Sequence, residues 1–217
     1  MDDRFERAKE RIENIIAQLK EAGWNFYSGW SDFEGNFPNS IGEASGVSRQ
    51  VFWDYDNEDF VLKVGLEQGD AKYCEKEETV YLAAKEQGLE KYFGWTAYVC
   101  TVDNMDIYAM EFLDCDECRV SDDSYQYHYR VYCDENGLDP DSDYAREQWE
   151  DLLDSDWSIC LDDSDAVTEW FLDGLLWQER DELADFLSDW KINDLHAANV
   201  GYRGNMPVFA DYAGWGW

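Results

Sequence analysis

Four polar residues near the C-terminal end of the sequence have types and spacing that suit chemistry on a metal-bound nucleotide. Asp194, His196 and Asn199 occupy one turn-like stretch. Asp211 follows an apolar run, residues 207–210, that predicts a short strand leading into a turn. This layout can aim two oxygen ligands and one base at a common point.

The first half of the chain predicts strands and two helices. Lys63 lies in a strand-like run, residues 60–64, and Glu77 and Glu78 lie in a predicted helix, residues 71–87. The elements around them are a predicted amphipathic helix from Asp2 to Glu21, ended by Gly23, and further strands at Arg49–Trp53, Thr96–Val102 and Asp106–Phe112. A glycine-containing turn precedes Arg49, and an acidic hairpin tip, Asp54 to Asp59, follows the first of these strands.

The charge balance excludes several classes of partner. With 17 basic and 50 acidic residues, the chain has a formal net charge of −33. This charge disfavours binding to nucleic acid and to anionic membranes, and it favours a basic partner. No apolar run approaches the roughly 20 residues of a membrane span, and the start of the chain lacks a signal-peptide pattern. We therefore expect a cytoplasmic protein.

Most of the negative charge lies in one segment. Residues 114–190 contain 25 Asp and Glu but only 4 Arg. Apolar residues recur there at helical spacing, which predicts helices with solvated acidic faces: Ala145, Trp149, Leu152 and Leu153; Val167, Trp170 and Phe171; and Leu183, Phe186, Leu187 and Trp190.

The six cysteines favour the reduced state, because cytoplasmic chains of this size rarely form disulfides. Cys115, Cys118, His128 and Cys133 have the types of a structural zinc site. The second half of this set lacks the two-residue knuckle of the first. We therefore expect no structural metal here.

Taken in order, the motifs resemble those of protein-kinase-like phosphotransferases over nearly the whole chain. They are EASGVSRQVF, FVLKVG, the glutamate-bearing YCEKEETVYL, IYAMEFLD, NDLHAANV and FADYAG. The pattern is most similar to the early serine/threonine kinases of short-tailed lytic bacteriophages. The resemblance implies an α+β, two-lobed, kinase-like fold. It has a helical extension (residues 1–40), an N-terminal lobe with an antiparallel sheet plus helix (41–113), and a truncated, mostly helical, acidic C-terminal lobe (114–217).

The resemblance also implies roles for individual residues. Lys63 corresponds to the lysine that holds the α- and β-phosphates of ATP, with Glu77 or Glu78 as its partner. The backbone around Glu111 and Leu113 corresponds to the hinge that binds adenine. Asp194 corresponds to the catalytic aspartate, and Asn199 and Asp211 correspond to the Mg²⁺ ligands. ATP and Mg²⁺ are the cofactors implied.

Several positions depart from the family pattern. Ala44, Gly46 and Arg49 stand where the family prefers three glycines, and Arg49 is either a phosphate-holding cation or a surface residue. His196 stands where eukaryotic serine/threonine kinases have lysine, and Ile192 and Asn193 replace the residues that usually brace the loop. Only Trp215 to Trp217 follow Gly214, so the elements that grip a peptide substrate are expected to be missing.

Plainer interpretations remain for each motif. Lys63 fits a solvated strand lysine, Glu77 and Glu78 an exposed acidic helix face, Asp194 with Asn199 a polar turn, and Asp211 a turn former. For the whole chain, the sequence leaves three hypotheses. The first is a kinase acting on basic host proteins, and the second is an acidic scaffold that imitates nucleic acid and blocks a host nucleic-acid-binding or defence protein. The third is adaptation to high salt.

Overall fold

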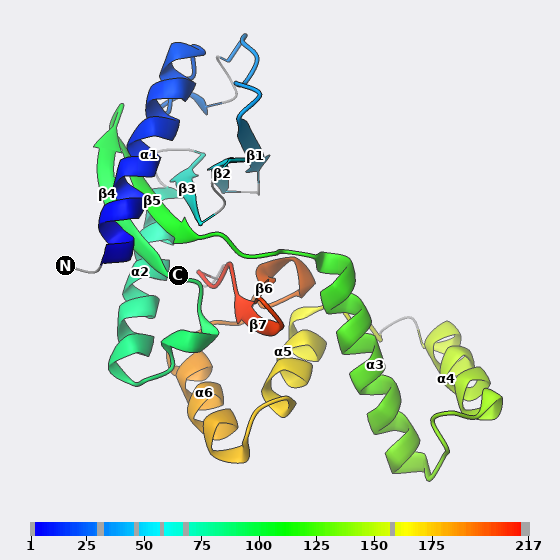
Figure 1. Ribbon diagram of the computed structural model, residues 1–217. Coiled ribbons are helices and arrows are strands. Elements are labelled where there is room, and N and C mark those ends of the chain that lie inside the picture. The colour runs from blue at the N-terminus through cyan, green and yellow to red at the C-terminus, as the bar shows by residue number, and fades with distance from the viewer. Residues whose placement is uncertain are drawn as a thin grey trace. The chain divides into compact units, whose positions relative to one another are not determined.

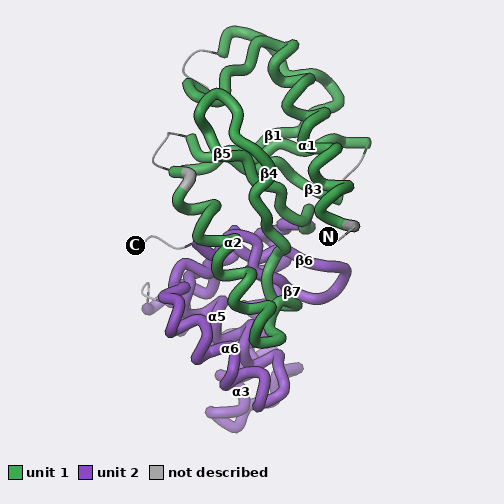
Figure 2. Tube along the Cα trace, turned by 90° about the vertical axis from the view of Figure 1, so that its left-hand side faces the viewer, with its two compact units in different colours: residues 1–113 green, residues 114–217 purple. Residues whose placement is uncertain are grey.

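The computed structural model describes residues 3–29, 33–45, 48–56, 59–66, 70–156 and 159–213. The chain divides into two compact units, residues 1–113 and residues 114–217 (Figure 2). The protein is α+β, with an antiparallel sheet and helices in unit 1 and mostly helices in unit 2 (Figure 1). This confirms the α+β part of the fold class predicted from the sequence.

Unit 1 is built on a five-stranded antiparallel sheet in the order β1-β2-β3-β5-β4. The strands are β1 (Ile41–Ser45), β2 (Arg49–Asp54), β3 (Phe60–Gly65), β4 (Thr96–Val102) and β5 (Met105–Glu111). The four strands predicted from the sequence are confirmed, with end points shifted by at most one residue. The segment expected to form a glycine-containing turn is instead the edge strand β1, in which Ile41 and Gly42 are buried and residues 43–45 are exposed.

The central strand β3 is buried, so a charged residue such as Lys63 on this strand needs a partner within the protein. All six of its residues are buried, which fits a strand that is covered on both faces. Successive side chains of a strand point to opposite faces of the sheet. Leu62 therefore shares one face with its cross-strand neighbour Phe52, whose ring packs 5.3 Å from the ring of Trp24. Lys63 points to the other face.

Two helices pack on this sheet. Helix α1 (Asp3–Glu21) buries the stripe Ala8, Ile12, Ile15 and Leu19, and Gly23 follows it with a positive φ of 93°. Helix α2 (Ala71–Glu86) contacts β3, β4 and β5. A short 3₁₀ helix, η3 (Glu90–Tyr92), connects α2 to β4. Both predicted helices are confirmed over the described residues.

The described residues of unit 2 form four α-helices and a small hairpin. The helices are α3 (Glu117–Asn136), α4 (Asp143–Ser155), α5 (Ser164–Asp173) and α6 (Trp177–Asp189). Side-chain caps stabilise the first turns of α3, α4 and α5. The capping residues are Asp116, Ser142 and Asp163, and each accepts a hydrogen bond from the backbone amide three residues ahead. The 3₁₀ turn η4 (Ala197–Asn199) then leads into β6 (Val200–Arg203) and β7 (Met206–Phe209).

The four residues considered for zinc do not come together. Cys118 and Cys133 lie near opposite ends of α3, and 15 residues of helix correspond to about 22 Å. Cys133 is buried, whereas Cys115 and Cys118 are exposed, and His128 Nε2 lies 3.1 Å from the carbonyl oxygen of Ala166. Within the described ranges, no group of three or more His, Cys, Asp or Glu residues is placed to hold a metal ion.

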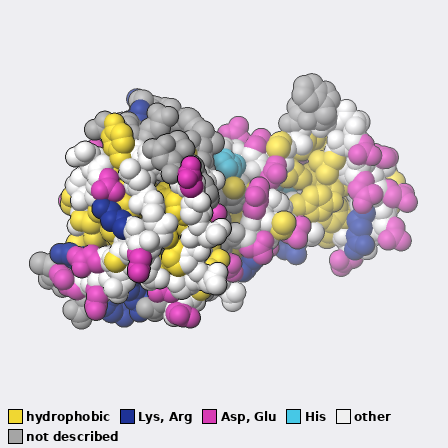
Figure 3. All heavy atoms as spheres, turned by 90° about the horizontal axis from the view of Figure 1, so that it is seen from above, with side chains coloured by type: hydrophobic (Ala, Val, Ile, Leu, Met, Phe, Trp, Pro, Cys, Tyr) yellow, Lys and Arg dark blue, Asp and Glu magenta, His cyan; other side chains and the backbone are white. Residues whose placement is uncertain are grey.

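Acidic side chains are spread over the surface (Figure 3). In the view shown, Asp and Glu are distributed across the face and Lys and Arg are few. The predicted helical segments of unit 2 do bury their apolar residues, for example Trp149 on α4 and Leu183 on α6. Of the helices that the structure describes, none combines the length and the apolar character needed to cross a membrane.

Candidate functional site

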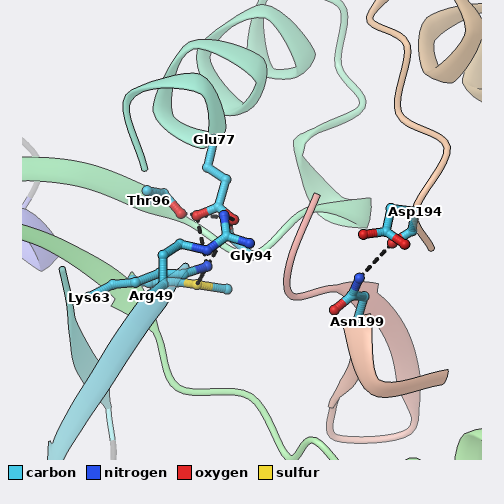
Figure 4. A network of polar contacts seen from close by, with 8 residues as sticks. Arg49, Lys63, Glu77, Gly94, Thr96, Asp194 and Asn199 are labelled. Atoms are coloured by element: carbon cyan, nitrogen blue, oxygen red, sulfur yellow. Dashed lines mark hydrogen bonds and ion pairs between the residues drawn. The ribbon is translucent and has the colours of Figure 1, made fainter. Parts of the chain in front are cut away.

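The first group of candidate residues centres on Lys63 and Glu77 in unit 1 (Figure 4). Lys63 Nζ donates to both carboxylate oxygens of Glu77, each at 2.8 Å. The Lys63 side chain is 4% exposed and that of Glu77 is 0% exposed. Removing two charges from water is costly, so burial of this kind requires close pairing. The pair is therefore neither a solvated lysine nor an exposed helix face.

Glu77, and not Glu78, is the partner of Lys63. Glu78 Oε1 accepts a hydrogen bond from the backbone amide of Tyr98 at 2.9 Å, which ties α2 to β4. Neighbouring residues on a helix point about 100° apart, so only one of the two glutamates can face β3. The sequence left this choice open because both positions lie on the same predicted helix.

Arg49 joins the same carboxylate. Its Nη1 lies 3.0 Å from Glu77 Oε1, the oxygen that Lys63 also contacts, and the Arg49 side chain is 12% exposed. The two cationic nitrogens therefore lie within about 6 Å of each other, where like charges repel by roughly 3 kcal/mol at an effective dielectric constant near 20. Glu77 holds the two cations together against that repulsion. Arg49 is thus part of the buried cluster and not a surface residue.

The other described candidates in unit 1 lie on strands of the sheet or shortly after a strand. Leu113 is buried, and its backbone amide makes no hydrogen bond to any described residue. The side chain of Glu111 accepts from the amide of Trp95 at 3.2 Å. Ala44 is exposed on β1 and pairs with Val51 of β2. Gly46 lies outside the described residues.

The second group lies in unit 2, in the segment between α6 and β6. Asn199 Nδ2 donates to the backbone carbonyl oxygen of Asp194 at 2.6 Å (Figure 4). The Asn199 amide is thereby oriented with its nitrogen toward the loop, and within the described part of the chain its oxygen has no hydrogen-bond partner. An oriented amide oxygen of this type is a suitable ligand for a hard cation such as Mg²⁺.

Asp211 is brought to the same loop by the hairpin. Val200 of β6 pairs with Phe209 of β7, and the backbone carbonyl oxygen of Asn199 accepts from the amides of Ala210 at 2.8 Å and Asp211 at 3.2 Å. Asp194, Asn199 and Asp211, which span 18 positions of the sequence, are therefore linked by direct backbone and side-chain hydrogen bonds. Gly214, the end of the D-Y-A-G motif, lies outside the described residues.

His196 lies beside Asp194. Its Nε2 lies 3.8 Å from Asp194 Oδ1, and the side chains of His196 and Asp194 are 41% and 27% exposed, respectively. A polar contact this open to solvent contributes little stability. Both side chains remain accessible to a ligand.

Three supporting contacts were not found from the sequence. Tyr202 on β6 donates its hydroxyl to Asp123 Oδ2 on α3 at 2.7 Å, and the guanidinium of Arg119 lies 3.5 Å from the centre of the Tyr202 ring. Phe209 on β7 stacks on Phe171 of α5, with ring centroids 4.1 Å apart. These contacts hold the hairpin that follows Asn199 and precedes Asp211. They join residues far apart in the chain, and no local pattern reveals them.

Unit 1 thus carries two cationic groups on a buried carboxylate. Unit 2 carries three oxygen-bearing side chains, those of Asp194, Asn199 and Asp211, on hydrogen-bonded backbone segments. Comparison with protein-family models, with curated proteins and with solved structures finds no match to this chain.

Proposed function

We propose that the protein is an ATP-dependent phosphotransferase that transfers the γ-phosphate to Ser or Thr hydroxyls of basic proteins. The observation that carries this proposal is the bidentate contact between Lys63 and Glu77, buried between β3 and α2. A buried ion pair is weak evidence for stability, since apolar residues often serve as well. The presence of the Lys63–Glu77 pair in a buried position therefore favours a function that needs a fixed, charged ammonium group.

The proposed role of Lys63 follows from this geometry. Glu77 holds the ammonium group in one position and favours its charged state, so that no reorganisation is needed when phosphate oxygens arrive. Phosphoryl transfer requires little covalent assistance, and positioning together with charge stabilisation supplies most of the rate. A rigid cation is therefore a useful catalytic element.

Asp194, Asn199 and Asp211 provide the complementary groups. The carboxylate of Asp194 would accept the proton of the attacking hydroxyl while the hydroxyl oxygen bonds to the γ-phosphorus and the bond to ADP breaks. Asn199 and Asp211 fit Mg²⁺ because it prefers oxygen ligands. The ion would neutralise charge on the phosphates. His196, beside Asp194, would help to hold the transferred phosphate when protonated.

The host-directed part of the proposal rests on charge. A net charge of −33 attracts basic partners and accelerates their encounter. The bacteriophage resemblance adds that these partners would be proteins of an infected host. A substrate rich in Lys and Arg around the acceptor hydroxyl is the expected class.

A second function is favoured by the concentration of acid in unit 2. Positions 114–190 contain 25 acidic residues and 4 basic residues. This excess of negative charge suits an acidic scaffold that occupies a nucleic-acid-binding site on a host protein. Such binding would depend on long-range attraction and would weaken steeply with salt.

One pair of variants separates the two functions. Asp194→Asn removes the base but changes the net charge by one unit only, so it should lower phosphate transfer from labelled ATP by about 10²- to 10⁴-fold and leave charge-driven binding intact. The triple variant Asp151→Lys, Asp154→Lys, Asp156→Lys changes exposed residues at the end of α4 and should weaken binding to a basic partner while self-labelling continues. If the wild type transfers no phosphate and Asp194→Asn still binds its partner fully, the phosphotransferase proposal is wrong and the acidic scaffold takes its place.

A further inference from the structure

Basic residues are scarce in this chain, yet several gather near the start of α2. Only 17 of the 217 residues are Lys or Arg. Arg49 and Lys63 share Glu77 Oε1, and the cationic groups of Arg49 and Lys72 lie 5.5 Å and 4.9 Å from the centre of the Tyr73 ring. The first turn of α2 carries no acidic residue, although acidic residues are favoured there by the helix dipole. The cationic groups of Arg49, Lys63 and Lys72 therefore gather around Glu77 and Tyr73.

The strand register places Arg49 on the same face of the sheet as Lys63. Val51 pairs directly with Lys63, and Arg49 lies two residues from Val51 on β2, so all three side chains point to one face. This is the face toward Glu77 of α2. Of the two cations, Arg49 is the more exposed, with 12% of its side chain accessible compared with 4% for Lys63.

From this arrangement we propose that Arg49 is a second phosphate-binding group and that the ligand of unit 1 is a polyphosphate chain. The inference rests on the proposed function and adds the class of ligand recognised. The guanidinium is planar and presents its donors in a fork that matches phosphate oxygens, and the Tyr73 ring and Glu77 hold it in place. Two cations within about 6 Å of each other can contact adjacent phosphates of one chain. Arg49 thereby replaces part of the backbone contact that a glycine-rich loop would provide.

Recognition through two cations predicts how the affinity for each ligand depends on Arg49. ATP and inorganic tripolyphosphate should bind in an Arg49-dependent way, ADP should bind more weakly, and adenosine should show no dependence on Arg49. Loss of a hydrogen bond to a charged group corresponds to an affinity loss of about 10- to 100-fold. Arg49→Lys keeps the charge without the fork and should fall between the wild type and Arg49→Met.

The experiment measures binding of these four ligands by calorimetry to the wild type, Arg49→Met, Arg49→Lys and the control Arg7→Met. Arg7 is exposed on α1, and its replacement changes the net charge by the same amount without touching the cluster. Circular dichroism checks that each variant is folded. The expected result is a selective loss of ATP and tripolyphosphate affinity in Arg49→Met, partial recovery in Arg49→Lys and no change in Arg7→Met.

The other outcomes separate the two proposals. If ATP binds equally well to the wild type and to Arg49→Met, Arg49 is only a structural partner of Glu77, and the inference is wrong while the proposed function stands. If tripolyphosphate binds in an Arg49-dependent way but no nucleotide binds, the phosphate site is supported and the proposed function fails. If the wild type binds none of the four ligands, both are overturned.

Discussion

At the scale of single residues, Glu77 is the centre of the unit 1 cluster. It accepts from Lys63 and Arg49 while being 0% exposed, so its charge is compensated within the protein and not by water. Both cations pair with Glu77, whereas Glu77 keeps one cationic partner when the other is removed. Loss of Glu77 should therefore cost more stability than loss of Lys63.

We predict that Glu77→Gln destabilises the protein more than Lys63→Met does. Glu77→Gln removes the carboxylate between two cations, and breaking a buried pair in this way costs about 3–5 kcal/mol. Lys63→Met leaves Glu77 in contact with Arg49, so the cost should be smaller. Urea unfolding gives both values. Glu78→Gln is the matched control and should cost less than about 1 kcal/mol, since a glutamine oxygen can still accept from Tyr98. A Glu77→Gln value no larger than that of Glu78→Gln would contradict this account.

A second prediction at this scale concerns Asp211. Mg-ATP at about 100 times its dissociation constant should stabilise the wild type by about 2.7 kcal/mol, which corresponds to a rise of roughly 5–10 °C in melting temperature. Asp211→Ala should abolish that rise because one Mg²⁺ ligand is lost. Asp185→Ala, an exposed acid on α6, should respond as the wild type does. Absence of any shift in the wild type at millimolar Mg-ATP would remove the nucleotide site.

At the scale of elements, the β6–β7 hairpin depends on its attachment to α3. Tyr202 provides that attachment through its hydroxyl bond to Asp123, and the backbones of Tyr202 and Asp114 exchange two further hydrogen bonds. Burial of the phenol, together with the hydrogen bond to Asp123, raises the pKa of Tyr202 above its ordinary value. The folded state therefore favours the neutral phenol.

Tyr202→Phe should lower the free energy of unfolding by about 1–3 kcal/mol at pH 7, the range for a hydrogen bond to a charged group. Because the pKa of Tyr202 is raised by folding, the stability it contributes is complete below the unfolded-state pKa near 10 and is lost as the pH increases through the higher folded-state value. The difference between wild type and Tyr202→Phe should therefore narrow above pH 10. Denaturant titrations from pH 7 to pH 11 measure it, with Tyr144→Phe as a surface control. A difference that stays constant to pH 11 would contradict the raised pKa.

At the scale of the whole molecule, self-repulsion is the main consequence of composition. A formal charge of −33 on 217 residues opposes the compact state, and salt screens this repulsion. The fold tolerates it because, among the described acidic residues, only Glu77 is buried, and the helices of unit 2 bury apolar residues beneath the others.

We predict that the melting temperature rises with ionic strength. Increasing sodium chloride from about 0.01 M to about 1 M shortens the screening length from roughly 30 Å to roughly 3 Å, so repulsion between surface carboxylates falls sharply. The triple variant Asp151→Lys, Asp154→Lys, Asp156→Lys replaces three negative charges with positive ones and should gain less from added salt. Scanning calorimetry of both proteins tests this. An equal gain in the two would mean that salt acts through some effect other than charge screening.

The sequence by itself determined most of the elements of this protein. Local apolar patterns were sufficient for α1, α2 and the strands β2 to β5, because a helix buries a stripe of residues at helical spacing and a central strand such as β3 is an almost continuous apolar run. The edge strand β1 was not predicted, because its exposed residues 43–45 give no alternating apolar signal and it is defined by pairing with β2. Asp194, Asn199 and Asp211 were also selected from type and spacing, and Lys63 was selected from the resemblance to protein-kinase-like phosphotransferases.

Only the tertiary structure decided which of these residues act together. The choice of Glu77 over Glu78 depends on the rotation of α2 against β3, and the inclusion of Arg49 depends on the register between β2 and β3. The hydrogen bond between Asn199 and Asp194 depends on the path of one loop, and the Tyr202–Asp123 contact joins residues 79 positions apart. Local patterns report the burial of a residue, whereas pairing depends on orientation and register, which arise only when the elements pack.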